Sequence, residues 1–382
     1  MSFAGEPNAP CAYVYHVPDP EPDYVQHTFL SRNSIHRGSG LECPLVTVRD
    51  VHLPVATQPD IDTLVAYARR AEAGGYERVW MPETWGRDAV TCCAALASST
   101  SSIGIGTSVL PVYSRSPALL AQTAATLQEW SSGRFRLGIG PSGPAVVEAW
   151  HGTSFDRPLR RTRETIDIVR AILSGDPVEY RGECYQLLGF RLRCDPPAPT
   201  PPIDAAGLGP KSVELAGRFA DGWHAIVFTP DGLRTRLADL HRGVSLGDRA
   251  PEDVRTTLSL TCCALPDGER ARSLARQHVA FYLGAMGTYY RDSLARQGYE
   301  SEATAIAAAW GNGERERACE LVGAELLDEL CAVGTPAEAR TSIERFERID
   351  GLDAVAVSFP RGASPAEIER TLDALAPDRP TA

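Results

Sequence analysis

The stretch that decides the fold is Arg134-Phe135-Arg136-Leu137-Gly138-Ile139-Gly140. It is short and mostly apolar at alternate positions, with Gly133 before it and Pro141 after it. A helical pattern with Pro117 at its first turn precedes this run, and a second helical pattern over 161–173 follows it. A short apolar run with turn residues at both ends and helices on both sides is typical of a strand in a parallel sheet.

The same alternation continues through most of the chain. Eight apolar runs of this kind can be counted: Val48–Val55, Arg78–Pro82, Ile103–Pro111, Arg134–Gly140, Pro202–Gly207, Trp223–Phe228, Thr256–Leu265 and Leu352–Phe359. Eight strands connected through helices predict a (β/α)8 TIM barrel of class α/β. A doubly wound open sheet is the alternative, although such sheets more often have five to seven strands.

Three segments do not belong to a minimal barrel. Residues 1–44 are rich in proline and lack periodicity, which predicts a poorly ordered N-terminal extension before a barrel over 45–378. The segment 174–202 predicts a hairpin followed by a proline-rich connector. The segment of about 267–333 predicts a helical insertion after strand seven.

Composition excludes several classes of function. The 382 residues contain 38 Lys and Arg against 49 Asp and Glu, and a net charge of −11 argues against nucleic acid or an anionic membrane as partner. The sequence shows neither an apolar stretch of membrane-spanning length nor a secretory signal, so we expect a cytoplasmic protein. The ten cysteines lack metal-ligand spacing, and no metal is predicted.

In barrels of this kind the site lies at the carboxyl ends of the strands. The run Gly207-Leu208-Gly209-Pro210-Lys211 follows the fifth strand and begins a helix, and it contains the one lysine of the chain. Glycines allow close approach, and free N–H groups at a helix start bind phosphate. The segment therefore predicts a phosphate site. An ordinary tight turn with a solvated lysine is the alternative.

Three other strand ends provide candidate residues. Gly140-Pro141-Ser142, after strand four, is predicted to face a ligand. Glu83 follows strand two near tryptophans and is either an acid/base group or the partner of Arg87. His52, at the end of strand one, is either a proton carrier or a core histidine. No Ser-His-Asp catalytic triad can be recognised. We therefore expect an organic cofactor to carry out the chemical step on a small-molecule substrate.

Several segments in order carry a family resemblance. They are Ala68–Tyr76 with Val79-Trp80, Ile105–Pro111, Ser131–Gly140, Arg160–Glu164 with Leu173–Gly175, and Gly207–Arg218 with Ala220–Gly222. Together they resemble the bacterial-luciferase-like superfamily of flavin- and deazaflavin-dependent enzymes. Within that superfamily the chain is similar to the branch that uses coenzyme F420, near methylenetetrahydromethanopterin reductase.

The resemblance implies hydride transfer at C5 of the deazaflavin, no metal and a homodimer. It also implies a cis peptide bond between Ser108 and Val109, which with Thr107 would lie against the ring, and phosphate contacts from Gly207 through Lys211. Thr84 and Trp85 would lie beside the ring together with Glu83. Glu83, His52 and Trp85 are therefore the catalytic candidates.

The sequence also departs from its relatives. It has Glu83-Thr84 where relatives often show Asp-His, His52 where the reductase carries a glutamate, and Ser142-Gly143 where relatives have an acid. The proton-transfer residues and the substrate therefore do not carry over. An FMN-dependent monooxygenase and a barrel that binds deazaflavin without catalysis stay open as alternatives.

Overall fold

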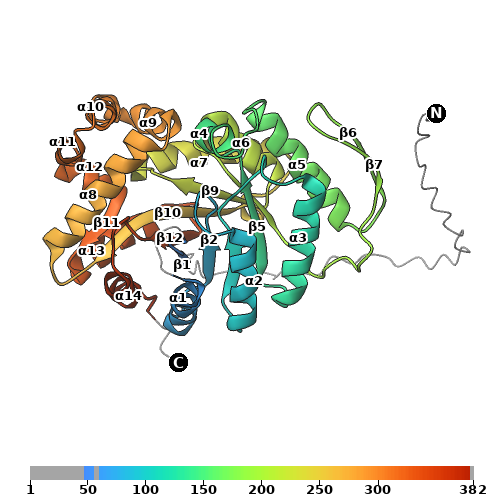
Figure 1. Cartoon of the computed structure of the whole chain (residues 1–382), viewed down its shortest axis with the longest axis horizontal. Coiled ribbons are helices and arrows are strands. Elements are labelled where there is room, and N and C mark those ends of the chain that lie inside the picture. Colours follow the sequence, from blue (N-terminus) through green and yellow to red (C-terminus); the bar gives the residue numbers. More distant parts are fainter. Residues whose placement is uncertain (1–46, 56–59, 379–382) are drawn as a thin grey trace, which may run out of the picture. The chain divides into compact units, whose positions relative to one another are not determined.

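The computed structural model describes residues 47–55 and 60–378. Its centre is a closed barrel of eight parallel strands surrounded by helices (Figure 1). The barrel strands are β1 Val48–His52, β2 Arg78–Met81, β3 Gly104–Thr107, β5 Phe135–Gly140, β8 Ile203–Ala206, β9 Gly222–Ile226, β10 Arg255–Ala264 and β12 Ala354–Ser358. Strand β12 pairs with both β10 and β1, which closes the ring. The predicted TIM barrel is confirmed, and the predicted extension over 1–44 lies outside the described residues.

Helices connect successive strands and cover the outside of the barrel. They are α1 Ile61–Gly74, α2 Ala89–Ser99, α3 Pro117–Trp130, α4 Pro144–Val147, α5 Pro158–Leu173, α6 Pro210–Phe219, α7 Pro230–Leu246, α13 Pro336–Glu347 and α14 Pro365–Ala374. Their first turns are fixed by local chemistry. Asp60 Oδ1 accepts a hydrogen bond from the Thr63 N–H, and Thr335 forms a capping box with Glu338. Gly75 ends α1 in the left-handed region at φ 85°.

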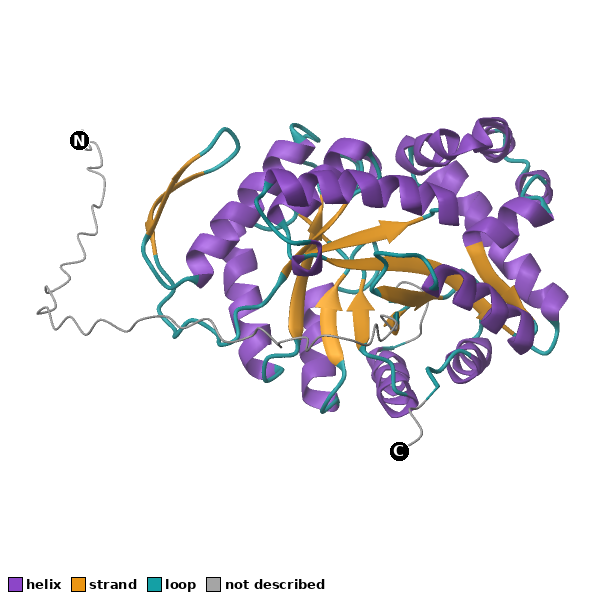
Figure 2. Ribbon diagram, turned by 180° about the vertical axis from the view of Figure 1, so that it is seen from behind, coloured by secondary structure: helices purple, strands orange, loops and turns teal. Residues whose placement is uncertain are grey.

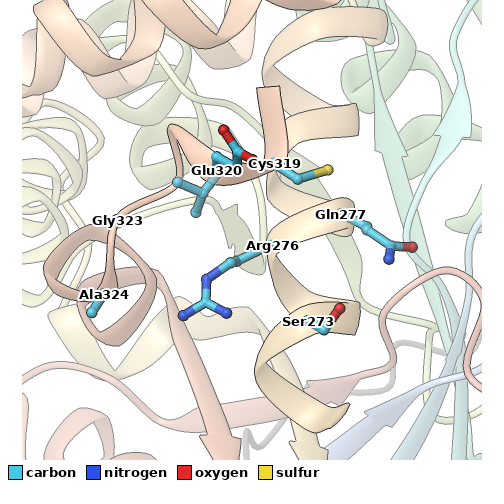
Figure 3. Close-up of a pocket in the computed structure, with 8 residues that line it drawn as sticks. Ser273, Arg276, Gln277, Cys319, Glu320, Gly323 and Ala324 are labelled. Atoms are coloured by element: carbon cyan, nitrogen blue, oxygen red, sulfur yellow. The ribbon is translucent and has the colours of Figure 1, made fainter. Parts of the chain in front are cut away.

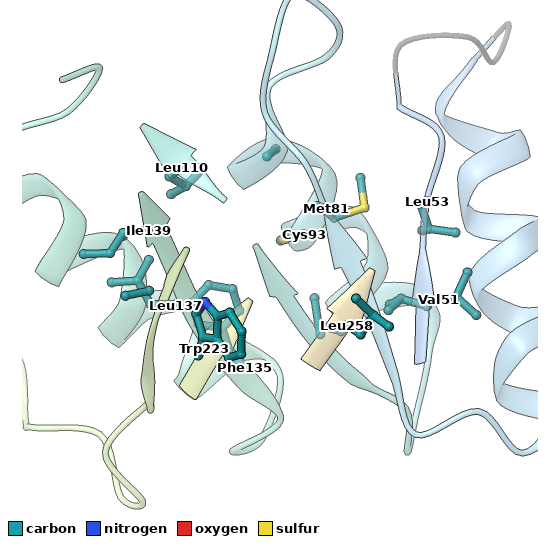
Figure 4. Packing of buried hydrophobic residues seen from close by; sticks show 14 of the residues in the cluster. Val51, Leu53, Met81, Cys93, Leu110, Phe135, Leu137, Ile139, Trp223 and Leu258 are labelled. Atoms are coloured by element: carbon teal, nitrogen blue, oxygen red, sulfur yellow. The ribbon is translucent and has the colours of Figure 1, made fainter. Parts of the chain in front are cut away.

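The main apolar core lies between the strands and these helices. Side chains that point outward from the barrel, among them Val51, Met81, Leu137 and Ile139, are fully buried (Figure 4). Because successive side chains of a strand point to opposite faces, the neighbours of these residues along each strand point into the barrel. These inward residues are mostly polar, and they include the ion pairs Arg255–Asp50 and Arg136–Asp204.

The segment after β10 forms a second layer with its own apolar core. It contains α8 Gly268–Ala285, α9 Thr288–Leu294, a π-helical turn Ala295–Tyr299, α10 Glu300–Gly311, α11 Arg315–Glu320, α12 Ala324–Leu330 and β11 Cys331–Gly334. The insertion was predicted to be helical, and its last element is instead a strand. The reason is the length of β10: its end, Thr261–Ala264, extends past β9 and pairs with β11.

The predicted hairpin is confirmed as β6 Val178–Arg181 and β7 Gln186–Phe190, which pair antiparallel. It extends away from the barrel wall (Figure 2). Leu110–Pro111, labelled β4, continues the third barrel strand beside β5. Among the described residues, no helix combines the length and the apolar character that crossing a membrane requires.

Candidate active site

Parallel strands bring the predicted residues to one end of the barrel, which we call the mouth. His52 is the last residue of β1, Glu83–Trp85 follow β2, Ser108 and Val109 follow β3, Gly140 ends β5, and Gly207–Lys211 follow β8. Their common position is a consequence of strand direction, because all eight strands run the same way. The mouth is therefore the candidate site.

The peptide bond between Ser108 and Val109 is cis, as predicted. The Val109 side chain packs over β5, where a Cβ on Gly140 would lie 2.8 Å from Val109 Cγ2. A glycine at position 140 therefore makes room for Val109. Ser108 points the other way, across the barrel.

Ser108 reaches a buried histidine on the opposite wall. Its Oγ lies 3.1 Å from His224 Nδ1, and His224 Nε2 lies 3.2 Å from Asp204 Oδ2. Burial opposes ionisation of Asp204, but Arg136 and the hydrogen bond from His224 hold the pKa of this carboxyl well below its ordinary value. An ionised carboxylate only accepts hydrogen bonds, so His224 Nε2 carries the proton that faces it. In the neutral ring we therefore assign Ser108 as the donor to Nδ1.

Trp80 fixes the orientation of the His224 ring. The two rings pack edge to face with their centroids 4.4 Å apart, and Trp80 Nε1 donates a hydrogen bond of 2.8 Å to Asp50 Oδ2. The indole occupies the space above Gly106, where a Cβ would lie 2.2 Å from Trp80 Cζ3. The Ser108–His224–Asp204 chain is thus held by packing as well as by hydrogen bonds.

A second histidine–serine pair lies beside the first. His52 Nδ1 is 3.2 Å from Ser259 Oγ, and the ring centroids of His52 and His224 are 6.5 Å apart. His52 Nε2 is buried and has no hydrogen-bond partner among the described residues. Burial, and then the neighbouring His224, lower the pKa of His52 to about 3, so its imidazole is neutral at physiological pH. A buried nitrogen without a partner marks a place where a ligand can bind.

Glu83 is held in an ion pair on the rim. Its two oxygens accept from Arg115 Nη1 at 2.5 Å and Arg115 Nη2 at 3.0 Å, and Arg115 also contacts Asp88. The sequence suggested Arg87 as the alternative partner, and the structure assigns Arg115 instead. The reason is that the loop after β4 brings Arg115 across to the loop after β2. A carboxylate held by two guanidinium hydrogen bonds is poorly suited to donate a proton.

Thr107 is turned away from the mouth. Its side chain is fully buried, and its Oγ1 donates to Gly138 O at 2.8 Å and accepts from Gly138 N–H at 3.0 Å. Both bonds fasten β3 to β5. The hydroxyl is therefore used within the barrel wall, and a cofactor contact from Thr107 stays a prediction. Trp85 is exposed on the rim, as its predicted role requires.

The loop after β8 has the local structure that the sequence indicated. Gly209 caps α6, and Pro210 occupies the first helical turn. A Cβ on Gly207 would lie 2.6 Å from Ser212 Oγ, so this glycine lets the helix begin close to the strand. Lys211 is exposed beside the helix start. Phosphate binding here stays a prediction.

Two strained residues lie at the mouth. Ser142, after β5, has φ 59°, and Val227, after β9, also has φ 59°. The left-handed region is unfavourable for a β-branched residue, and such strain concentrates at functional sites. The sequence signals neither conformation.

Three residues of this site were not predicted from the sequence: His224, Asp204 and Ser259. Alternation along the strands could have found them, because it predicts that His224 and Asp204 share the barrel interior with Trp80.

A hollow of about 400 Å³ lies outside the barrel. Figure 3 shows it between α8, from which Ser273, Arg276 and Gln277 come, and the segment Cys319–Ala324. It contains none of the residues predicted for the site. Size alone therefore does not identify the candidate site of this molecule, whose predicted residues lie at the mouth.

Comparison with known proteins is consistent with this geometry. Residues 45–351 match the family model described as luciferase-like monooxygenase. A Mycobacterium tuberculosis protein named as a coenzyme F420-dependent oxidoreductase is 34% identical over 80% of this chain and 92% of its own. The 5,10-methylenetetrahydromethanopterin reductase of Methanolobus tindarius is 29% identical over 78% of this chain and 90% of its own.

A solved structure supports the fold. The coenzyme F420-dependent tetrahydromethanopterin reductase of Methanopyrus kandleri superimposes with a TM-score of 0.76 at 21% identity, covering 87% of this chain and 97% of that one. The barrel, the matched family and the curated relatives agree. The chain belongs to the luciferase-like monooxygenase family, and its relatives include proteins named as coenzyme F420-dependent oxidoreductases.

Proposed function

We propose that the mouth binds coenzyme F420 with its deazaflavin ring against Ser108 and Val109, and exchanges a hydride with a small-molecule substrate held at His52. The observation that carries this proposal is the buried His52 Nε2, which has no hydrogen-bond partner in residues 47–55 and 60–378. Such an atom costs about 1–3 kcal/mol unless a ligand satisfies it. A ring or substrate oxygen above His52 would do so.

The other residues at the mouth fit the same group. Lys211 and the N–H groups at the start of α6 would hold the phosphate, with Gly207, Leu208, Gly209 and Pro210 lying beneath it. The exposed Trp85 with Thr84 would cover one side of the ring, and Gly140, Pro141 and Ser142 would flank it. When bound, the coenzyme supplies a carbon that accepts or donates a hydride.

His52 and Glu83 receive different roles in this proposal. His52 is neutral, so it would hold a substrate oxygen by a hydrogen bond without carrying charge. Glu83 would shape the rim through Arg115 and would not transfer a proton. Trp85 would contact the substrate at the entrance.

Binding and turnover of the full chain test the proposal. Oxidised coenzyme F420 should bind more tightly than FMN in a fluorescence titration. The bound oxidised coenzyme should then be reduced by at least one of 2-propanol, cyclohexanol and glucose 6-phosphate, or the bound reduced coenzyme should be oxidised by methylenetetrahydromethanopterin. The variant His52→Gln, which keeps a side-chain amide near the Nε2 position, should raise the KM for that substrate more than the Kd for the coenzyme.

The family description favours one other candidate, an FMN-dependent monooxygenase. Tighter binding of FMN, with oxygen consumed by the reduced complex and an oxygenated product, would establish that function instead. Binding of coenzyme F420 with no turnover of any donor or acceptor would indicate a barrel that only binds deazaflavin.

The proposal includes assembly and location. We propose a homodimer in the cytoplasm, which the resemblance to the coenzyme F420 branch supports. Light scattering of the purified chain measures the assembly: about twice the mass of one 41.2 kDa chain is expected.

A further inference from the structure

A small pocket adjoins His52 between the ends of β9, β10 and β12 and the helix α8; we call it the β10 pocket. Its volume is about 20 Å³, and its lining includes Ser259 and Ser358. Ser259 Oγ is the hydrogen-bond partner of His52 Nδ1, and Ser358 is paired with His52 in the register of β12 and β1. A substrate oxygen bound at His52 would therefore lie beside this pocket.

The order of the strands places the β10 pocket across the barrel from the cis bond. In the closed ring, β5, β8 and β9 lie between β3 and β10 on one side, and β2, β1 and β12 lie between them on the other. Strand β10 is therefore opposite β3, which ends just before Ser108. A deazaflavin ring with one face against Ser108 and Val109 turns its other face toward His52 and the β10 pocket.

We infer that the β10 pocket is the specificity subsite of the proposed reaction, and that it takes one uncharged group of methyl size bound to the reacting carbon. The inference rests on the proposed function and narrows its substrate to uncharged alcohols with such a substituent, or to the carbonyl compounds that they become. Val279, which lines the pocket from α8, is the residue that limits the size of the group.

The reaction balances for such an alcohol. Its C–H bond breaks, and the hydride goes to the oxidised coenzyme. Its O–H bond breaks, and the proton goes to solvent. The alcohol loses two electrons, the coenzyme gains them, and a carbonyl compound forms.

The size of the group follows from the volume of the pocket. A cavity needs about 10–15 Å³ of this kind of volume to hold one water molecule. The β10 pocket, at about 20 Å³, therefore holds one methyl group and little more. Val227 and Val279 supply apolar wall on the two sides that belong to the β9 end and to α8. An ethyl group would have to displace part of this wall.

The part of the wall formed by Val227 is held in place by the insertion. The Val227 backbone has φ 59°, which is unfavourable for a β-branched residue, and such strain concentrates at functional sites. Gln297 Nε2 donates to Val227 O at 3.1 Å, and Gln297 Oε1 accepts from the Thr229 N–H at 2.8 Å. One side chain of the insertion thus fixes the loop after β9, and the pocket keeps its shape.

The lining also excludes anions. No charged side chain lines the β10 pocket in residues 47–55 and 60–378. Its histidine, His278, is neutral at physiological pH, because burial, and then Arg361, lower its pKa to about 4. The Arg361 guanidinium is stacked on Phe281, 3.9 Å from the ring centroid, and the Arg361 N–H donates to His278 Nδ1 at 3.1 Å. A carboxylate in the pocket would be buried without a counter-ion, which is strongly unfavourable.

The first test needs no coenzyme. The full chain with ¹⁵N-labelled histidines is titrated by NMR with 2-propanol and, separately, with lactate, in which a carboxylate replaces one methyl group. His278→Gln identifies the His278 signals by their loss, and the exposed His241 controls for effects of the solvent. We expect 2-propanol to shift the His278 signals and lactate at the same concentration to leave them unchanged. Equal effects of the two compounds, whether present or absent, would overturn the inference.

The second test compares the turnover of alcohols that differ in one substituent. 2-Propanol and 2-butanol each have a methyl group on the reacting carbon, whereas 3-pentanol has only ethyl groups. One methylene in a fitted apolar pocket is worth about 10–200-fold in kcat/KM, so 3-pentanol should react at least about tenfold less well than 2-butanol. Equal kcat/KM for these two alcohols would contradict the size limit.

Substitutions at Val279 should move this preference in opposite directions. Val279→Ala enlarges the pocket and should raise the kcat/KM ratio of 3-pentanol to 2-propanol at least about tenfold. Val279→Leu fills the pocket and should lower kcat/KM for 2-propanol. Both replacements have a higher helix propensity than valine, which favours retention of α8. Val322→Ala makes the same truncation in the apolar core of the insertion, outside the β10 pocket, and should leave the ratio unchanged. An unchanged ratio in Val279→Ala would overturn the inference.

The tests separate this inference from the proposed function. Absence of coenzyme F420 binding would contradict the proposed function, whereas the NMR titration still decides whether the pocket selects uncharged compounds. Turnover of glucose 6-phosphate or lactate without turnover of any simple alcohol would keep the proposed function and remove the subsite.

Discussion

The two histidine–serine pairs at the mouth are similar in composition and different in surroundings. His52 and His224 each meet one serine hydroxyl through Nδ1, at 3.2 and 3.1 Å. The second nitrogen of His224 is hydrogen-bonded to Asp204, whereas His52 Nε2 has no hydrogen-bond partner in the described part of the chain. The hydrogen-bond partner of the second ring nitrogen therefore decides whether an imidazole can carry a positive charge or can only form hydrogen bonds as a neutral ring.

The largest expected effect comes from removing the carboxylate that distinguishes the pairs. Asp204→Ala leaves Arg136 and His224 buried without their partner, and breaking a buried ion pair in this way costs about 3–5 kcal/mol. Urea unfolding should show a loss of that size. Asp231→Ala is the control, because the Arg234–Asp231 pair is exposed and should contribute less than about 1 kcal/mol. Similar losses in both variants would contradict a special role for Asp204.

The second effect is the pH dependence that His52 gives to stability. Its pKa is lowered to about 3 in the folded protein, so below about pH 6.5 the unfolded chain binds a proton that the folded chain does not. Stability is complete above that pH and falls by about 1.4 kcal/mol per pH unit as the pH decreases, which is about 2 kcal/mol at pH 5.

His52→Gln should remove this contribution and flatten the curve of unfolding free energy between pH 7 and 5. His278 is expected to retain a slope of the same sign in the variant, because burial, and then Arg361, lower its pKa to about 4. Denaturant unfolding at four pH values measures both. Parallel curves for the variant and the wild type would mean that His52 is not neutral in the folded protein.

The third prediction concerns Lys211, at the predicted phosphate site after β8. Lys211→Glu places a negative charge beside the predicted phosphate, so the affinity for coenzyme F420 should fall about tenfold or more. The fold should persist, because an acid is favourable in the first turn of a helix. Titration of the variant and of Lys211→Gln, which removes the charge without reversing it, should give graded losses. Unchanged affinity in both would place the phosphate elsewhere.

The smallest effect concerns the two serines. Ser259→Ala and Ser108→Ala each remove one hydrogen bond to a buried imidazole, and each should lower the unfolding free energy by about 1 kcal/mol. Equal losses of stability would show that the two serines make the same structural contribution. A loss above about 3 kcal/mol for either one would indicate that its pair supports the fold itself.

Much of the fold could be predicted because its signals are local. Apolar runs such as Arg134–Gly140 and helix starts such as Pro117 and Pro210 identify their elements within a few residues. Eight runs separated by helices then leave few topologies other than the barrel. The β11 strand was missed because it needs the free end of β10, which is about 70 residues away in the sequence.

The candidate site divides in the same way. The sequence alone indicated the loop at Gly207–Lys211 and, through family resemblance, the cis bond at Ser108–Val109, because contiguous residues carry both. Only the tertiary structure decided that Ser108 meets His224, 116 positions later, and that Glu83 meets Arg115 and not Arg87. Barrel closure sets these partners, because it determines which inward-pointing side chains face each other across the axis and which loops adjoin on the rim. Separation along the chain carries no information about either.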